Sequence, residues 1–178
     1  MLALSAVGGL HAPFNPAALA LPDQLIDYTW GREHTFSDSA DVPLVHVDFT
    51  RPYEGPLRRA LLRVAAAAGM AIVDGGCIGV FQGPRLESAA EIERARRDGC
   101  DMAGMTSLPE AGLARELGLD FAGIAVVSNW AAGVAGDQGV AGQRHELDVA
   151  RSQRLPNRSR PLPRGVGEAA VEVARPRQ

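Results

Sequence analysis

Apolar, strand-like segments alternate with helical segments through the middle of the chain, and this alternation restricts the fold more than any other feature. Residues 56–70 place apolar side chains at three- and four-residue spacing, which predicts a helix that ends at Gly69. Further helices are predicted over residues 88–98 and 108–117. Residues 121–129 are almost purely apolar, as in strands buried on both faces. The pattern indicates an α/β sandwich.

Shorter segments add strands to this pattern. Residues 1–7 are apolar and predict a buried strand that stops at Gly8 and Gly9, where the missing Cβ lets the backbone turn or approach a ligand. Residues 45–49 alternate apolar and polar side chains, as a half-buried strand does. Residues 31–43 are polar and predict an irregular surface loop. The remaining strands are predicted within residues 21–29, 71–84 and 100–105.

Length and composition favour one globular domain. The chain has 178 residues, 46% of them hydrophobic, and a formal net charge of -3, which argues against a wholly disordered chain. Residues 1–136 form the predicted domain. Residues 137–178 hold eight of the 18 basic residues and several prolines, and we predict a mostly irregular, solvated tail there. A nucleic-acid-binding arm is the alternative, but the tail lacks lysine and interleaved aromatic residues.

Cysteine usage and the N-terminal segment favour the cytoplasm. Cys77 and Cys100 form no CxxC pair and have no clustered histidines beside them, which argues against a disulfide framework and a structural zinc site. The first 22 residues are apolar but have no positively charged start, and Pro13 and Pro16 interrupt them, so a signal peptide is not expected. No stretch reaches the roughly 18 apolar residues of a membrane-spanning helix.

Three segments occur in an order and spacing found in a known enzyme family. They are SAVGG at residues 5–9, the run at 83–119 that contains GPRLES and GMTSLPE, and IAVVSNWAAG at 124–133. In these segments the chain resembles the trimeric purine nucleoside and methylthioadenosine phosphorylases. The loop at 24–36 is similar to the methylthioinosine and methylthioadenosine branch of that family. The resemblance covers roughly residues 2–135 and is most specific in its middle segment.

This resemblance implies an α/β fold of the three-layer phosphorylase/hydrolase-like sandwich type, with a mixed central sheet that is incomplete at its N-terminal side. It implies phosphorolysis, in which phosphate attacks the anomeric carbon of a nucleoside and the purine leaves. Inorganic phosphate is the co-substrate, and no metal or organic cofactor is implied. A homotrimer with nucleoside and phosphate as its small-molecule partners is expected, and neither nucleic acid nor a membrane is.

The resemblance also assigns phosphate-binding residues. Thr106 of the GMT turn matches a hydroxyl residue that hydrogen-bonds phosphate, and Ser5 and Ala6 match a strand-end pair that meets phosphate and sugar. Met105 matches a residue that packs against the sugar and base. Hydroxyl and backbone N–H donors suit this task because negative charge gathers on the reacting groups.

Glu87 and Asn129 take the catalytic positions in the resemblance. They match the glutamate at the N1 edge of the purine and the asparagine at O6 and N7 in phosphorylases of 6-oxopurines, whereas adenine-specific relatives have aspartate at the second position. Leu86 matches the apolar wall beside the base. Trp130 and Ala131, which follow Asn129, complete the predicted substrate-binding set.

Other charged residues in these segments have less direct roles. Arg85 is expected to pair with an acid near its turn, and Glu110 lies in a first helical turn, where a negative charge is favourable. The resemblance implies that His34 reaches the site of a neighbouring subunit, because related trimers complete each pocket with a residue of the next chain.

The family's glycine-rich phosphate turn and a later Arg-His pair have no counterpart, since the printed sequence begins after the positions of both. Weaker phosphate binding is expected, because each charge-assisted contact contributes about 1.5–3 kcal/mol. The favoured function is phosphorolysis of S-methyl-5′-thioinosine to hypoxanthine and S-methyl-5-thioribose 1-phosphate. Phosphorolysis of inosine or guanosine, phosphorolysis of methylthioadenosine, and an inactive fragment stay open as alternatives.

Overall fold

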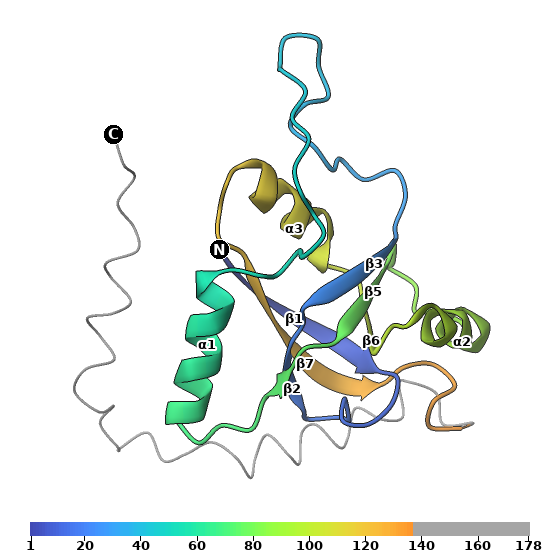
Figure 1. Cartoon of the computed structure of the whole chain (residues 1–178). Helices are drawn as coiled ribbons and strands as arrows, with labels where there is room; N and C mark the ends of the chain where they lie inside the picture. The colour runs from blue at the N-terminus through green and yellow to red at the C-terminus, as the bar shows by residue number, and fades with distance from the viewer. Residues whose placement is uncertain (137–178) are drawn as a thin grey trace.

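The central sheet contains both parallel and antiparallel strands. The structure is a computed structural model that describes residues 1–136, so the predicted tail at 137–178 lies outside the described residues. In the described chain, seven strands form one sheet in the order β3-β5-β6-β1-β7-β2-β4. The strands are β1 (Leu2–Gly9), β2 (Leu19–Leu21), β3 (Gln24–Tyr28), β4 (Val73–Asp74), β5 (Cys77–Phe81), β6 (Met102–Gly104) and β7 (Ala122–Trp130). The predicted α/β class and mixed sheet are confirmed (Figure 1).

Strand β1 joins the two halves of the sheet. It pairs parallel with β7 along its whole length, and its last two residues pair antiparallel with β6. The register with β7 shifts by one residue between Val7 and Gly8, so Ser128 is an extra residue on β7. The Ser128 hydroxyl shares its one hydrogen between the Val7 carbonyl at 3.2 Å and Asn129 Oδ1 at 2.6 Å. The hydrogen bond to Val7 ties the bulge to β1.

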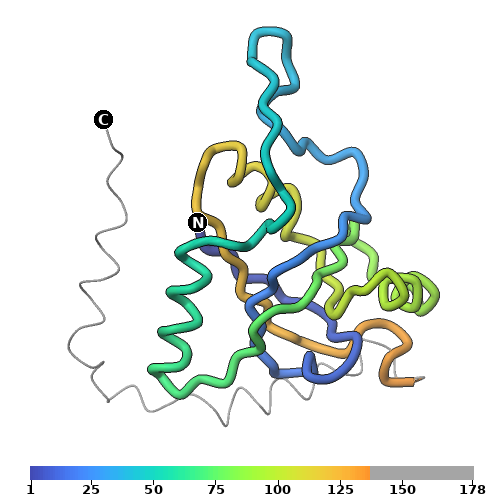
Figure 2. The backbone as a smooth tube through the Cα atoms, in the orientation of Figure 1, coloured from blue at the N-terminus to red at the C-terminus, as the bar shows by residue number. Residues whose placement is uncertain are grey.

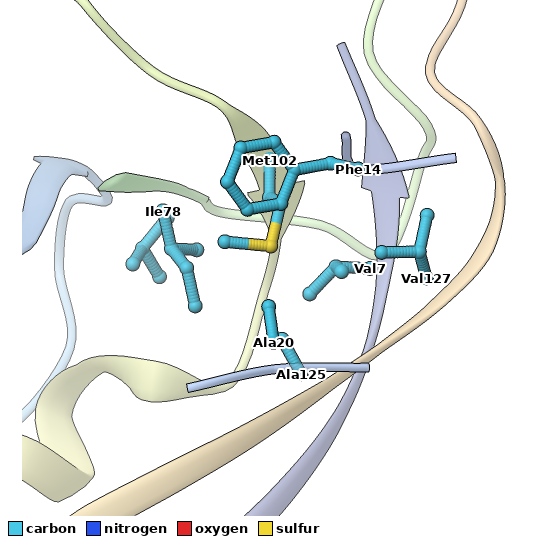
Figure 3. Packing of buried hydrophobic residues seen from close by; sticks show 8 residues of the cluster. Val7, Phe14, Ala20, Ile78, Met102, Ala125 and Val127 are labelled. Carbon is cyan, nitrogen blue, oxygen red and sulfur yellow. The ribbon is translucent and has the colours of Figure 1, made fainter. Parts of the chain in front are cut away.

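One apolar core is shared by strands from both halves of the sheet, which requires the sheet to curl around it. Figure 3 shows the Phe14 ring beside Met102, with Val7 and Val127 from the central strands nearby. Full burial of a side chain of this size contributes about 1.5–3 kcal/mol to stability. The buried members of this core are Val7, Phe14, Ala20, Ile78, Val80, Met102, Ala125 and Val127.

Helix α2 (Ala89–Asp98) lies where the sequence predicts it and has a defined cap at each end. The Ser88 hydroxyl accepts a hydrogen bond from the Glu91 N–H at 3.2 Å, and the Glu91 carboxylate accepts one from the Ser88 N–H at 2.7 Å. This reciprocal pair is a capping box. Gly99 ends the helix with φ 96°, a left-handed conformation that favours glycine. Both ends are therefore set by local sequence.

Helices α1 (Pro56–Ala67) and α3 (Ser107–Glu116) confirm the other two predicted helices. α1 and α2 lie at opposite sides of the sheet (Figure 1). α3 begins irregularly, because Leu108 precedes Pro109 and a residue before proline avoids the helical region; its φ and ψ are -120° and 140°. Within residues 1–136 no helix has the length and apolar character needed to cross a membrane.

The predicted strand at residues 45–49 is wrong. These residues belong to a segment without helix or strand, and Leu44 and Val45 are 70% and 50% exposed. The segment projects away from the sheet (Figure 2), and it pairs with no strand of the described chain. A segment that alternates apolar and polar side chains forms a strand only where a neighbouring strand can pair with its backbone N–H and C=O groups.

The prediction that residues 1–7 are buried is wrong for the first half of β1. Leu2 and Leu4 are 47% and 72% exposed, whereas Val7 is buried. No element of residues 1–136 covers those two side chains. On β7, Ile124 and Val126 are half-buried, so the expected burial on both faces is also incomplete there.

We expect Gly9→Ala to destabilise the fold strongly. A Cβ at Gly9 would lie 1.8 Å from the Phe14 carbonyl oxygen, and backbone cannot yield as a flexible side chain can. The loss should be about 3 kcal/mol or more. Gly112→Ala is the matched control: among the described residues nothing lies within 4 Å of its Cβ position, and alanine should stabilise α3 by about 0.5–1 kcal/mol. Urea unfolding of both variants measures this difference, and equal stabilities would contradict the close contact at Gly9.

Candidate active site

The hydroxyls of Ser5 and Thr106 lie 2.9 Å apart. Ser5 lies in β1, and Thr106 follows the end of β6. Thr106 is exposed and Ser5 is half-buried, so both can reach a ligand. Each hydroxyl has one hydrogen that can rotate toward a shared acceptor. The fold therefore brings together two hydroxyl donors that are 101 residues apart in sequence.

The backbone of Ala6 adds a third donor beside them. The Val7 carbonyl faces β7, where it accepts the bond from Ser128. Successive residues of a strand direct their N–H and C=O groups to opposite edges, so the Ala6 N–H faces the edge on which β6 and Thr106 lie. Two hydroxyls and one backbone N–H at one place suit a phosphate oxygen.

Glu87 lies in the turn before α2 and carries a buried oxygen. Its Oε1 is inaccessible and accepts no hydrogen bond from residues 1–136. Burial raises the pKa of the Glu87 carboxyl above its usual range, because the charged form is less well solvated there. An unpaired buried carboxyl oxygen is costly to the fold, and the Glu87 side chain has to turn outward before this oxygen can meet a ligand donor.

Arg85 does not pair with Glu87. It donates to both oxygens of Glu91, at 2.8 and 2.7 Å, and to the Leu86 carbonyl at 3.2 Å. The hydrogen bonds from Arg85, followed by the one from the Ser88 N–H, lower the pKa of Glu91 to about 2. The expectation that Arg85 pairs with a nearby acid is confirmed.

Asn129 follows the bulge on β7, and its neighbours orient its amide. Its Nδ2 donates to the Trp130 carbonyl at 2.7 Å, and its Oδ1 accepts from the Ser128 hydroxyl at 2.6 Å. The amide keeps one further N–H and one further lone pair for a ligand. Asn129 pairs with Gly8 in the sheet. Gly8 lies three residues beyond Ser5, roughly 10 Å along an extended strand.

Two close contacts hold the surrounding turns together. A Cβ at Gly83 would lie 2.6 Å from the Met105 sulfur, so the turn after β5 touches the turn after β6. A Cβ at Gly133 would lie 2.7 Å from the Ala89 Cβ, so the segment after Asn129 touches the first residue of α2. The ends of β5, β6 and β7 are thereby brought to one region.

Arg32 organises this region, although sequence reasoning did not select it. All five of its N–H groups are used: Nε donates to the Gln82 side chain at 3.2 Å, Nη1 to the carbonyls of Met105 at 2.9 Å and Leu108, and Nη2 to those of Phe81 at 3.1 Å and Gln82 at 2.8 Å. Arginine alone offers five donors in a fixed plane. The side chain fastens the end of β5 to the Met105–Thr106 turn.

The remaining predicted residues are less involved in these contacts. Leu86 is 52% exposed, so in this chain it forms no closed wall. Ala131 is buried, and its N–H donates to the Gly9 carbonyl at 2.9 Å; Trp130 is half-buried. His34 is exposed, with Nδ1 3.1 Å from the Arg32 carbonyl. Nothing here tests its predicted role at a neighbouring subunit.

A surface hollow of about 550 Å³ lies apart from the Ser5–Thr106 pair and is lined in part by Asp23, Arg51 and Arg58. Another, of about 410 Å³, borders the region through Arg32 and Leu108. The candidate site therefore rests on its donors and its buried carboxyl, and not on an enclosed cavity. No group of three or more histidine, cysteine, aspartate or glutamate side chains in the described chain is arranged to hold a metal ion.

A comparison with protein families gives one match, the phosphorylase superfamily, which extends over residues 1–157. The chain belongs to the phosphorylase superfamily. The resemblance found in the sequence motifs is thereby confirmed at the level of the family.

Named relatives and solved structures agree with this membership. Over 133 residues the chain is 56% identical to a probable S-methyl-5′-thioinosine phosphorylase of Xylella fastidiosa, covering 75% of this chain and 54% of that protein. It is 39% identical over 160 residues to the 6-oxopurine nucleoside phosphorylase of Pyrococcus furiosus, covering 87% and 60%. Methylthioadenosine phosphorylase from Schistosoma mansoni in complex with tubercidin superposes with a TM-score of 0.72 at 27% identity, covering 84% and 60%.

The chain matches only part of the length of each of these relatives. The chain spans between about half and two thirds of the length of the curated relatives it matches, with 54% and 66% for two probable S-methyl-5′-thioinosine phosphorylases. The residue roles assigned from the family motifs stay predictions.

We expect Arg32→Met to destabilise this phosphorylase-superfamily chain by about 2–4 kcal/mol, because several half-buried carbonyls lose their donor. Arg32→Lys should recover little, since three donors on a flexible stem cannot replace a five-donor plane. Arg63→Met, at an exposed position of α1, should change the unfolding free energy by less than about 0.5 kcal/mol. Urea unfolding measures all three, and a harmless Arg32→Met would show that the turns hold without it.

Glu87→Gln should stabilise the protein in a pH-dependent way. The pKa of Glu87 is higher in the folded than in the unfolded state, so the folded state loses stability as the pH rises above the ordinary value of 4.5 and the carboxyl ionises. Glutamine removes this loss. The melting temperature of the variant should exceed that of the wild type at pH 7 and equal it near pH 4. Glu93→Gln, at an exposed position of α2, is the control; an equal pH response in both variants would refute the burial effect.

Proposed function

We propose that this chain belongs to an enzyme that phosphorolyses 6-oxopurine nucleosides, with S-methyl-5′-thioinosine as the preferred substrate. The observation that carries the proposal is the pair Glu87 and Asn129, placed at turns that touch through Ala89 and Gly133. The names of the Xylella and Pyrococcus relatives support it. The products are hypoxanthine and S-methyl-5-thioribose 1-phosphate.

Phosphate binds between the Ser5 and Thr106 hydroxyls and the Ala6 N–H in this proposal. These donors hold one phosphate oxygen close to the anomeric carbon of the sugar, and holding the reactants in line removes much of the entropic barrier. Met105, which contacts the Gly83 turn, packs against the sugar. Arg32 acts as a positioning residue through its bond to the Met105 carbonyl.

Glu87 and Asn129 act on the leaving base. As the glycosidic bond breaks, its electron pair moves to the purine, and the base takes up the proton that phosphate loses. The free N–H of Asn129 donates to O6 or N7 while charge gathers there, which lowers the barrier because the donor is already oriented. The unpaired Oε1 of Glu87 accepts the N1 hydrogen that a 6-oxopurine carries and adenine lacks.

We further propose a cytoplasmic homotrimer. The segment that projects from the sheet exposes a set of large apolar side chains, which suits a subunit contact. These side chains are Trp30, Phe36, Val42, Leu44 and Val45. Both cysteines are free thiols, in keeping with a reducing compartment.

A phosphate-dependent release assay tests the function. The purified chain should release hypoxanthine from methylthioinosine faster than from inosine, and faster than adenine from methylthioadenosine. Asn129→Asp should lower kcat/KM for methylthioinosine by about 10- to 100-fold, since it removes a donor to developing charge. Thr106→Ala should raise the KM for phosphate about tenfold, whereas Thr106→Ser, which keeps the hydroxyl, should not.

Two outcomes would contradict the proposal. A folded chain that binds nucleoside but releases no base would be a remnant without turnover. Faster release of adenine than of hypoxanthine would assign it to methylthioadenosine. Light scattering on the same sample gives the mass of the assembly, and a monomer would exclude the trimer.

A further inference from the structure

The two cysteines, 23 positions apart, are brought to neighbouring places in the sheet. Cys77 opens β5 and Cys100 precedes β6, its parallel neighbour. The Cys77 N–H donates to the Asp101 carboxylate at 2.7 Å, and the Asp101 N–H donates to the Cys77 carbonyl at 2.9 Å. Cys77 is thus fastened to the residue that follows Cys100. A one-residue diagonal between adjacent strands separates Cα atoms by roughly 6 Å, within the 4.4–6.8 Å range that disulfides span.

Both thiols lie on the same face of the sheet. The Cys100 sulfur lies over Gly79, where a Cβ would be 3.0 Å away from it. Cys77 and Gly79 are two residues apart in β5, so they face the same side. Cys100 is buried in the cluster beneath α2, and Cys77 packs against that cluster. Gly79 has no side chain, and the Cys100 sulfur lies against the place that a Cβ there would take.

The two thiols differ in chemical character. The hydrogen bond between them raises the pKa of Cys77 and lowers the pKa of Cys100, and burial adds to the increase at Cys77. Cys100 is therefore the thiol that ionises more readily and is the better nucleophile. It is only 2% exposed, but it lines a surface hollow of about 350 Å³.

We propose that Cys77 and Cys100 form a reversible intramolecular disulfide when the protein meets a hydroperoxide. The Cys100 thiolate attacks the peroxide oxygen, the O–O bond breaks, and Cys100 becomes a sulfenic acid as hydroxide leaves. The Cys77 thiol then attacks the Cys100 sulfur, loses its proton, and displaces hydroxide, which leaves as water. Two thiols and one hydrogen peroxide give one disulfide and two waters. The peroxide accepts the two electrons that the sulfurs lose.

This inference does not depend on the proposed phosphorolysis. The disulfide would join the start of β5 to the start of β6, the strands that precede and follow α2 in the sequence. Glu87 and Thr106 come after the opposite ends of these two strands. Oxidation would therefore cross-link the frame of the candidate site without occupying any of its donors.

Mass spectrometry of the full chain tests the proposal. The reduced protein is treated with hydrogen peroxide and then blocked with N-ethylmaleimide. The expected product is a monomer that has lost two hydrogen atoms and takes up no maleimide, gives a tryptic peptide joining Cys77 to Cys100, and returns to two reactive thiols with dithiothreitol. Circular dichroism before and after treatment checks that the chain is folded.

Single variants separate the two roles. Cys77→Ser should stop the reaction at a Cys100 sulfenic acid that dimedone traps, and Cys100→Ser should leave Cys77 reduced under the same conditions. A folded wild-type chain that binds two maleimides after peroxide treatment, forms only disulfides between chains, or oxidises Cys100 to the sulfinic acid while Cys77 stays free would overturn the proposal. If a variant fails to fold, the result for the wild-type chain alone decides whether the proposal stands.

Discussion

The parallel pairing of β1 with β7 is the interaction on which the rest of this molecule depends. Every residue of β1 takes part in it, and the two strands stand between three strands on one side and two on the other. The pairing joins segments more than a hundred residues apart, so its loop-closure entropy must be offset by the burial of side chains such as Val7 and Val127. It also sets the spacing between the Ser5–Thr106 donors and Asn129. The register of the sheet therefore sets the geometry of the candidate site.

Local elements were the most predictable part of this fold, because their signals are contained in short stretches of sequence. The start of α2 is fixed by the capping box of Ser88 and Glu91, and its end is fixed by Gly99. Residues 45–49 show the opposite case, since their alternation is compatible with a strand but a strand needs a partner. The exposure of Leu2 and Leu4 is likewise invisible locally, because it depends on which other element lies over β1.

The family motifs predicted which candidate residues would lie together, but not the long-range contacts that hold them. The motifs placed Ser5 and Thr106 among the phosphate-binding residues, and the fold brings their hydroxyls together. Arg32 was missed because a single arginine in a polar loop has no motif or spacing that indicates its role. Its importance comes from backbone carbonyls of Phe81 and Met105, which are distant in sequence and become its acceptors only after the sheet forms.

The extra residue Ser128 makes the position of Asn129 sensitive to chain length. Up to Val7 each step along β1 matches one step along β7, and after the bulge Asn129 stands opposite Gly8. Deleting Ser128 would leave Asn129 opposite Gly8 but would close the bulge that aims the side chains after it, and the Asn129 amide would lose its Ser128 partner. A substitution at residue 129 therefore disturbs the strand less than an insertion or a deletion beside it. The place of the Asn129 amide depends on the number of residues in β7 as well as on their chemistry.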